Sequence, residues 1–331
     1  MLRSIPDDHN PTSEWLGERR IGDQGRNRLG FQWKYCRWVI GVCFALSGCC
    51  CADQDTQGQG ECICESEWHG VFLPQGSFRL ATALAHKGYI VAAVNHPGTT
   101  THDRSPQAAA QLWQRPADLS RAIDAVLAQP QRFGEIATGR VAVVGHSLGG
   151  WTALEIGGAR FDPERFDLDC KVHTTLASCS VYQQINPAST PDARTRLAAD
   201  LRDKRVTSIV SLDLGQSRGM TDASLAALPV PTLVIAAGAP SADLPAELES
   251  ANLARRLPPA SSRYVEISDA SHFSFLSLCK PGAVAMLEED VPGDGIICQD
   301  GEGGRSRVAI QQQVIGLIDE FLAQPLITTQ R

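Results

Sequence analysis

The amino-acid sequence predicts an α/β fold built on a doubly wound, mostly parallel sheet. From about Gly76 onward, short apolar runs alternate with amphipathic segments, which is the pattern of parallel strands buried between two layers of helices. One of these runs, residues 141–144, is rich in β-branched residues. It passes through a Gly-x-Ser-x-Gly turn straight into an apolar-periodic segment, residues 151–156, so strand, sharp turn and helix follow one another without a linker.

Composition limits the classes of protein to consider. The chain has 331 residues, of which 43% are hydrophobic, and this is enough for one large domain with a substantial core. The net charge of −7 and the absence of a Lys/Arg block exclude a nucleic-acid binder, which needs a concentrated basic face. No phosphate-binding Gly-rich loop, zinc-ligand spacing or flavin fingerprint occurs, so we expect neither a cofactor nor a metal.

Residues 1–68 are expected to form an atypical N-terminal region. Within it, the segment 34–49 has two basic residues, a short apolar run at 38–46 and small residues up to Cys49, which is a signal-peptide pattern with a core too short to span a bilayer. The last four residues resemble the lipobox of bacterial lipoproteins and make Cys49 a possible lipid anchor. The segment therefore predicts export (periplasmic, membrane-anchored or secreted), with a buried segment of a cytoplasmic protein as the alternative.

The first part of the regular pattern contains two helices and two strands. An amphipathic helix is expected over residues 78–85, a buried strand over 89–94, and a second helix over 116–127 whose apolar side chains share one face. The next strand is the run 141–144. His96 lies in the loop after the first strand, where it is either a site residue or, more often in such positions, a turn histidine.

The second part opens with a stretch without strand pattern, residues 161–204. We expect it to form an excursion over the carboxyl ends of the strands, where substrate sites of such sheets are found. Strands are predicted at 206–212, 230–237 and, more weakly, 263–267. A helix with an apolar face over 310–321 closes the chain.

Ser147 is the predicted nucleophile. In a nucleophile elbow the serine backbone is strained, and Gly145 and Gly149 leave room for the strand and helix to approach closely. This arrangement lifts the Ser147 hydroxyl clear of the sheet at a helix N-terminus, which favours negative charge. The backbone N–H of Leu148 is then the first oxyanion donor. The alternative is a merely structural Gly-rich turn.

A serine nucleophile needs a base and an orienting carboxylate, in the chain order Ser, acid, His for this kind of turn. His272 lies in the loop after the final predicted strand and is the expected general base. Asp213, at the carboxyl end of strand 206–212, and Asp243, after strand 230–237, are the candidate acids. Asp213 could instead be a helix N-cap or a surface carboxylate.

From about Gly76 to the C-terminus, the chain resembles the α/β-hydrolases grouped as dienelactone-hydrolase-like or platelet-activating-factor-acetylhydrolase-like esterases. The motifs that carry the resemblance are residues 92–98, 115–118, 145–150, 221–227 and 271–276. Many members keep the acid in a Gly-x-x-Asp segment, and the matching position here is Ser241. Acetylhydrolase-type members instead have a Leu-Asp pair after the preceding strand, which matches Leu212-Asp213. The resemblance thus favours Asp213, with Asp243 as the alternative.

The resemblance also implies a catalytic domain over residues 69–331 and a second oxyanion donor, the N–H of Val71 after His69-Gly70. The chain departs from the family here. Members have a strongly apolar strand before His-Gly and glycines after it, whereas this chain has Val71-Phe72-Leu73 and no recognisable upstream strands. The N-terminal strands are therefore expected to be atypical or missing.

These residues predict a serine hydrolase that cleaves carboxylic esters, of short acyl or lactone type, through an acyl-enzyme intermediate. The partner is then a small-molecule or lipid-like ester, and the oligomeric state stays open. Two alternatives are a catalytically impaired binding protein, because of the atypical segment near Val71, and an amide or polyester hydrolase on the same triad.

Four of the eleven cysteines lie in the part of the chain that reads as an enzyme. Proximity predicts the disulfides Cys170–Cys179 and Cys279–Cys298, although connectivity does not follow from sequence. Such pairs suit an exported protein, since disulfides persist in oxidising compartments. Four free thiols in a cytosolic protein are the alternative.

Overall fold

A computed structural model gives the fold. It describes residues 36–42, 51–54, 60–63, 79–100, 103–133, 136–301 and 303–324, the first three ranges as backbone only. All of these belong to one unit, Tyr35–Arg331.

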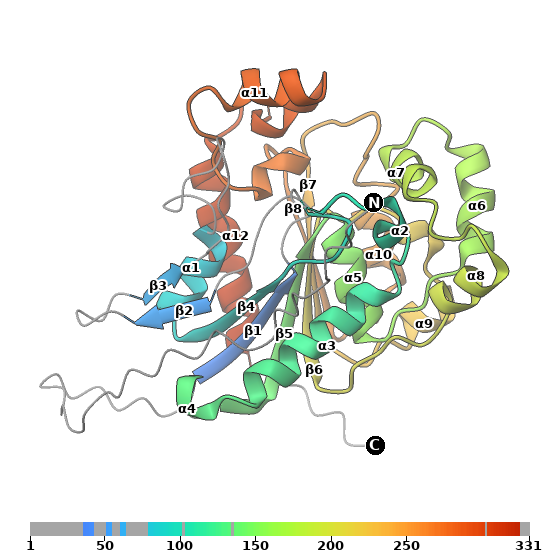
Figure 1. Ribbon diagram of the computed structural model, residues 1–331. Coiled ribbons are helices and arrows are strands. Elements are labelled where there is room, and N and C mark those ends of the chain that lie inside the picture. Colours follow the sequence, from blue (N-terminus) through green and yellow to red (C-terminus); the bar gives the residue numbers. More distant parts are fainter. Residues whose placement is uncertain are drawn as a thin grey trace, which may run out of the picture. The chain divides into compact units, whose positions relative to one another are not determined.

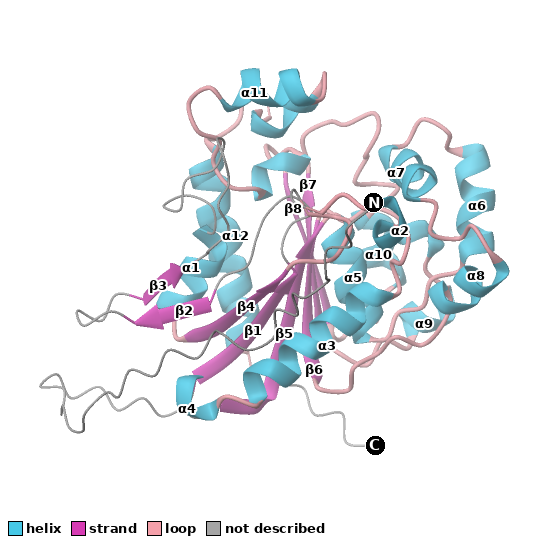
Figure 2. Ribbon diagram, viewed as in Figure 1, coloured by secondary structure: helices cyan, strands magenta, loops and turns pink. Residues whose placement is uncertain are grey.

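A six-stranded parallel sheet forms the centre of this unit, in the order β4-β1-β5-β6-β7-β8 (Figure 2). The strands are β1 (Cys36–Val42), β4 (Tyr89–Val94), β5 (Ile136–His146), β6 (Val206–Leu212), β7 (Thr232–Ala237) and β8 (Ser262–Ile267). The doubly wound parallel sheet predicted from the sequence is confirmed. Of the five predicted strands, four lie within two residues of the observed bounds, and the fifth, β5, is longer than predicted.

Helices cover both faces of the sheet (Figure 1). On one face lie α1 (Arg79–His86) and α12 (Arg307–Ala323), and on the other α3 (Gln114–Leu127), α5 (Leu148–Gly157) and α10 (Ser250–Arg256). Each face has its own core of buried side chains contributed by the strands and the covering helices. In this layered arrangement, helices shield both faces of the sheet from solvent.

The run of apolar residues in β5 follows from burial on both faces. Val141 and Val143 belong to the core under α3 and α5, while Ala142 and Val144 belong to the core under α1 and α12. Because side chains alternate along a strand, an apolar residue is needed at every position of a strand that is covered on both sides.

Three helices occupy the stretch that the sequence predicts as an excursion: α6 (Pro163–Val172), α7 (Ala177–Ile185) and α8 (Pro191–Leu197). They lie together beside α10 and α9 (Asp222–Ala226) in Figure 1. Two of them begin with proline at the first helical position and a capping side chain just before it, Asp162 for α6 and Thr190 for α8.

The remaining elements are short. They are β2 (Cys51–Gln54) and β3 (Gly60–Ile63), which pair with each other, α2 (Pro106–Ala109), α4 (Pro130–Phe133), α9 (Asp222–Ala226), α11 (Ala283–Asp290), and the 3₁₀ turns η1 (Ser217–Gly219), η2 (His272–Phe275) and η3 (Asp294–Cys298).

The N-terminal region differs from the expected division at residue 68, because β1 lies inside the sheet between β4 and β5. Gly41 pairs with Ala93 on one side and with Val144 on the other. A short apolar run after basic residues has the same composition in a buried strand and in a signal peptide, so sequence pattern does not separate the two.

Removal of a signal peptide before Cys49 would delete β1 and leave β4 and β5 without a partner on their facing edges. A strand at β1 and a cleaved signal at 34–49 therefore exclude each other in one molecule. Cys49 itself lies outside the described residues, and export and lipidation stay predictions. Among the described residues, no helix has both the length and the hydropathy needed to cross a membrane.

An ionisable side chain without a charged partner among the described residues is enclosed beneath α5. Glu155 on α5 is fully buried. Burial, the largest cause, raises the pKa of its carboxyl well above the ordinary value. The carboxyl therefore stays protonated in the folded protein at pH values where it ionises in the unfolded chain.

We expect Glu155→Gln to stabilise the protein increasingly as the pH rises. Above the ordinary glutamate pKa of 4.5, the unfolded chain gains free energy by ionising Glu155 while the folded protein does not, so the free energy of unfolding falls with pH. Glutamine removes this loss. Urea unfolding at acidic and at mildly alkaline pH measures it, with a gain of about 1 kcal/mol or more at the higher pH. Exposed Glu289→Gln is the control; equal effects of the two variants would contradict the account.

Candidate active site

Ser147 lies in a strained turn between β5 and α5. Its backbone has φ 55° and ψ −123°, a left-handed conformation that costs a residue with a side chain about 1–3 kcal/mol. The Ser147 N–H donates to the carbonyl of Leu212 on β6, at 2.9 Å, which ties the turn to the neighbouring strand. Strain of this kind persists only where surrounding contacts hold it, and it presents the serine side chain at the edge of the sheet.

Gly145 is required for this turn. A Cβ atom at Gly145 would lie 2.0 Å from the carbonyl oxygen of Gly149, so any other residue would push α5 away from β5. The first turn of α5 is equally tight against β6, because a Cβ at Gly150 would lie 2.6 Å from Ser211 Oγ. The close approach of helix and strand that the sequence motif predicts is thus present.

The structure brings together Ser147, His272 and Asp213. His272 Nε2 lies 3.1 Å from Ser147 Oγ, and His272 Nδ1 lies 2.7 Å from Asp213 Oδ2. An ionised carboxylate only accepts hydrogen bonds, so Nδ1 carries the ring proton and Nε2 is left as the acceptor for the serine hydroxyl. This is the geometry in which a histidine can take a proton from the serine.

Asp213 is held rigidly. It follows β6 directly, its residue is only 3% exposed, and its second oxygen, Oδ1, accepts the N–H of Ala237 at 2.9 Å. The alternative acid, Asp243, instead accepts a hydrogen bond from the Ser241 hydroxyl at 2.6 Å, on the surface. Of the two candidate acids, the one that contacts His272 is therefore Asp213.

His272 is fixed by the turn that it begins. It is the first residue of η2, and Ser271 and Ser274 form a reciprocal capping box that closes this turn. Its backbone carbonyl accepts Nε2–H of His146 at 2.8 Å, and the two imidazole rings lie 4.4 Å apart. Burial, followed by the charge of His272, lowers the pKa of His146 well below its usual value, so His146 is a neutral donor.

Sequence reasoning missed His146. It is the variable residue between Gly145 and Ser147 in the motif. The signal in the sequence that could have indicated a role is its position, since this polar residue follows four apolar strand residues and a glycine at the end of the strand. Its contact with His272, 126 residues later, depends on the tertiary structure.

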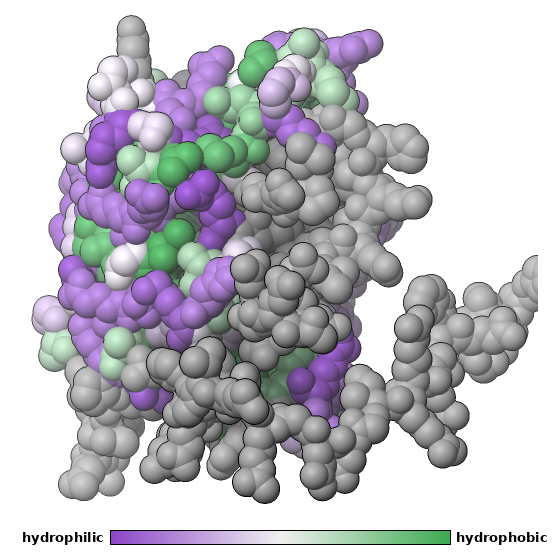
Figure 3. Space-filling view, turned by 90° about the vertical axis from the view of Figure 1, so that its left-hand side faces the viewer, coloured by the Kyte–Doolittle hydropathy of each residue, from purple (hydrophilic) through white to green (hydrophobic). Residues whose placement is uncertain are grey.

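A cavity of about 810 Å³ opens beside Ser147 and His272. One wall comes from α7 and the loop after β7, with Val181 and Leu244, and the other from Phe273 and Ile296. Ile296 is one of several exposed apolar side chains on α11 and η3. Figure 3, which draws the left-hand side of Figure 1, shows hydrophobic residues among hydrophilic ones at its top, the end of the molecule at which Figure 1 places α11. The cavity is large enough for a small ester and its leaving group.

Disulfides stabilise both walls. The structure contains the two predicted pairs, Cys170–Cys179 between α6 and α7, and Cys279–Cys298 between the segment before α11 and η3. Each bond closes a loop beside the cavity, and closing a loop restricts the unfolded chain.

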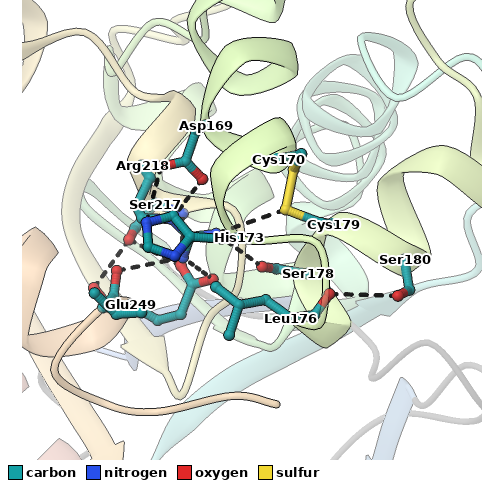
Figure 4. Close-up of a disulfide and its surroundings, with 11 residues drawn as sticks. Asp169, Cys170, His173, Leu176, Ser178, Cys179, Ser180, Ser217, Arg218 and Glu249 are labelled. Atoms are coloured by element: carbon teal, nitrogen blue, oxygen red, sulfur yellow. Dashed lines mark hydrogen bonds and ion pairs between the residues drawn. A yellow bond between two sulfur atoms is a disulfide. The ribbon is translucent and has the colours of Figure 1, made fainter. Parts of the chain in front are cut away.

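Buried Arg218 holds together residues next to the cavity wall that α7 forms (Figure 4). Its Nε lies 2.7 Å from Asp169 Oδ2, its Nη1 pairs with Glu249, and its Nη2 donates to Ser178 Oγ at 3.2 Å. Ser178 precedes Cys179 and lines the cavity. A charge this deeply buried is tolerated only when paired, as it is here with Asp169 and Glu249. Together with the bond to Ser178, these contacts connect α6, α7 and the residue before α10.

The first predicted oxyanion donor, the N–H of Leu148, belongs to a residue at the cavity. Leu148 is the first residue of α5 and lines the cavity, and the first N–H groups of a helix have no partner within the helix. The second predicted donor, Val71, lies outside the described residues. β1 ends at Val42 on the same edge of the sheet, since Gly41 pairs with Val144 three residues before Ser147.

Among the described residues, one group of possible metal ligands is close enough to chelate, namely Asp169, Cys170 and Cys179. The two sulfur atoms are bonded to each other. They therefore do not offer thiolates, which are the form of cysteine that binds metals.

The model of the alpha/beta hydrolase family matches residues 68–287. No curated protein matches the chain. Among solved structures, the fold is similar to that of a ferulic acid esterase from Streptomyces cinnamoneus, with 17% sequence identity, a TM-score of 0.48, and coverage of 90% of this chain and 71% of that one.

We expect peptide mapping to find Cys170, Cys179, Cys279 and Cys298 protected from alkylation until the protein is reduced. Denaturation without a reductant exposes buried thiols but leaves disulfides intact, so iodoacetamide in denaturant separates the two cases. Labelling of these four residues before reduction would contradict the observed pairs.

Proposed function

The chain belongs to the alpha/beta hydrolase family, and we propose that it is a serine hydrolase that cleaves carboxylic esters. The observation that carries this proposal is the hydrogen-bonded series from Ser147 through His272 to Asp213 at the edge of a cavity. The order nucleophile, base and buried acid is the arrangement that turns a serine hydroxyl into a nucleophile.

In the first half of the reaction, Ser147 Oγ attacks the ester carbonyl while His272 Nε2 takes the hydroxyl proton. The tetrahedral intermediate then expels the alcohol, which receives that proton from His272, and an acyl-enzyme remains on Ser147. In the second half, water attacks the acyl group, His272 again takes and returns a proton, and the carboxylic acid leaves.

Asp213 stabilises the imidazolium that forms in both steps. Its carboxylate lies 2.7 Å from His272 Nδ1 and is held from behind by the Ala237 N–H. The bond also fixes the tautomer that leaves Nε2 free to accept. The charge is thus already in place before the reaction, which avoids reorganisation in the transition state.

The oxyanion is stabilised by the N–H of Leu148 and, as the family resemblance implies, by that of Val71. Losing one such donor costs about 3 kcal/mol in the transition state. The departure of residues 69–73 from the family pattern is the one feature that favours the alternative, a catalytically impaired binding protein.

The cavity supports short acyl or lactone-type esters as substrates. Its volume of about 810 Å³ suits a small molecule, and Val181, Leu244, Phe273 and Ile296 offer apolar contacts around the reacting centre. Amide or polyester hydrolysis would use the same three residues and differ only in how these walls contact the substrate.

Hydrolysis of p-nitrophenyl butyrate by the full-length protein tests the proposal. We expect activity that falls by about 10⁶ in Ser147→Ala, because the acyl-enzyme no longer forms. Equal activity in the two proteins would overturn the role of Ser147. No activity in a folded wild-type protein would favour the binding protein.

The two candidate acids are separated by matched substitutions. Asp213→Asn is expected to lower kcat by about 10⁴, since an amide does not hold the required imidazole tautomer. Asp243→Asn, which changes an exposed carboxylate bonded to Ser241, is expected to leave kcat close to the wild-type value. A large loss in Asp243→Asn alone would contradict the assignment.

A further inference from the structure

A second cavity, of about 250 Å³, lies between the loop after β4 and the helices α2 and α3. It shares no lining residue with the catalytic cavity, and nothing in the proposed reaction uses it. Its polar lining includes His96 and Thr99 in the loop and Arg115 and Asp118 on α3, together with Gln111, Gln114 and Arg121. His96, Arg115 and Asp118 also belong to sequence motifs that the proposed function leaves unexplained.

Arg115 brings a buried positive charge to this cavity. Its residue is 3% exposed, its Nε donates to Thr152 Oγ1 at 2.9 Å, and its Nη1 donates to Thr99 Oγ1 at 2.8 Å. Its Nη2 has no hydrogen-bond partner among the described residues. A buried charged donor without a partner is costly, and this cost is recovered when an acceptor is supplied.

His96, another lining residue of this cavity, carries a buried acceptor without a partner among the described residues. Its Nδ1 lies 2.7 Å from Asp118 Oδ2, so Nδ1 carries the proton and Nε2 presents a lone pair. That Nε2 atom also lacks a partner within the described part of the chain. Burial, and next the charge of Arg115, lower the pKa of His96 to about 4, so the ring is neutral at physiological pH.

The charges around the cavity do not cancel. Arg115 and Arg121 are both positive, and Asp118, which pairs with Arg121, is the one carboxylate among the lining residues. The charge of Arg115 is therefore not neutralised by a lining residue, and it lies near His96, whose Nε2 lacks a hydrogen-bond donor among the described residues. A complementary ligand therefore carries a negative oxygen and, next to it, a hydroxyl group.

We propose that this cavity is a binding site for a small oxyanion that carries a hydroxyl group, such as hydrogen phosphate or an α-hydroxy carboxylate. The negative oxygen accepts from Arg115 Nη2, and the hydroxyl donates to His96 Nε2. Both bonds satisfy groups that the fold itself leaves unpaired, and the bond to Arg115 is of the charge-assisted kind.

The site is connected to the nucleophile turn. Thr152 Oγ1, which accepts from Arg115 Nε, donates in turn to the carbonyl of Leu148 at 2.9 Å. An anion on Arg115 thus holds the side chain that braces the first turn of α5. Binding is expected to raise the thermal stability of the protein, because a ligand that binds only the folded state stabilises it.

Isothermal titration of the full-length protein with inorganic phosphate, and with sulfate at matched ionic strength, tests the site. Phosphate keeps a proton near neutral pH and sulfate does not, so sulfate leaves His96 Nε2 facing an acceptor. We expect phosphate to bind and sulfate to bind about tenfold more weakly or not at all. Absence of phosphate binding, as for a cavity that holds only water, or equal binding of both anions, would overturn the proposal.

Substitution of His96 locates the binding. Asparagine places its amide nitrogen where Nδ1 of histidine lies, so His96→Asn keeps a donor for Asp118 and removes the acceptor in the cavity. We expect it to weaken phosphate binding about tenfold and to abolish the preference over sulfate. Arg104→Gln removes an exposed charge outside the cavity and is the matched control. Equal phosphate binding in wild type and His96→Asn would refute the site.

A spectroscopic measurement covers the case in which His96→Asn does not fold. In ¹⁵N-labelled wild-type protein, the resonance of His96 Nε2 is expected to shift when phosphate is added, because its lone pair gains a donor, and to stay in place with sulfate. A resonance that does not respond to phosphate would rule the site out.

Discussion

The close approach of α5 to β5 is the constraint on which the rest of the site depends. Without a side chain at Gly145, the helix begins directly above the strand, and Ser147 is held in a left-handed conformation at its first turn. The register of the sheet determines which residues lie next to Ser147. His146 pairs with Leu212 across β5 and β6, so the residues that follow them, Ser147 and Asp213, leave the sheet side by side. Parallel strands that end at one edge thus deliver both side chains to one place.

The third member of the series reaches the same edge from a more distant strand. Ala237 pairs with Ile267 at the ends of β7 and β8, and the turn that carries His272 begins a few residues later. His146 then holds the carbonyl of His272, and Ala237 holds the carboxylate of Asp213. His272 and Asp213 are therefore each positioned by a buried neighbour, as a precise site requires.

The three residues that the sequence predicts as nucleophile, base and favoured acid, Ser147, His272 and Asp213, lie in contact in the structure. The prediction was possible because strand ends are visible in the apolar pattern and the order of the chain limits the choices. Between Asp213 and Asp243, spacing alone left both open, and the resemblance to acetylhydrolase-type members favoured the first. Surface and interior carboxylates look alike in a sequence, whereas the structure shows one buried against His272 and the other bonded to Ser241.

Other features could not be read from sequence, for physical reasons. The sequence places His96 in a turn and does not reveal its partner, because Asp118 lies 22 residues away on a helix and only the fold brings the two into contact. The charged cluster around Arg218 could not be predicted either, because the sequence does not show whether an arginine is buried or exposed. The strand β1 has a composition that also fits a signal peptide, and its pairing with β4 and β5 is visible only in the tertiary structure.

Covalent labelling with a fluorophosphonate, followed by peptide mapping, tests the central claim most directly. The reagent phosphonylates a serine only when a neighbouring base activates it and an oxyanion is stabilised, so it reports the chemistry without a chosen substrate. The account predicts one adduct, on Ser147, that disappears in His272→Ala. An adduct on another serine, or no adduct in the folded wild-type protein, would contradict it.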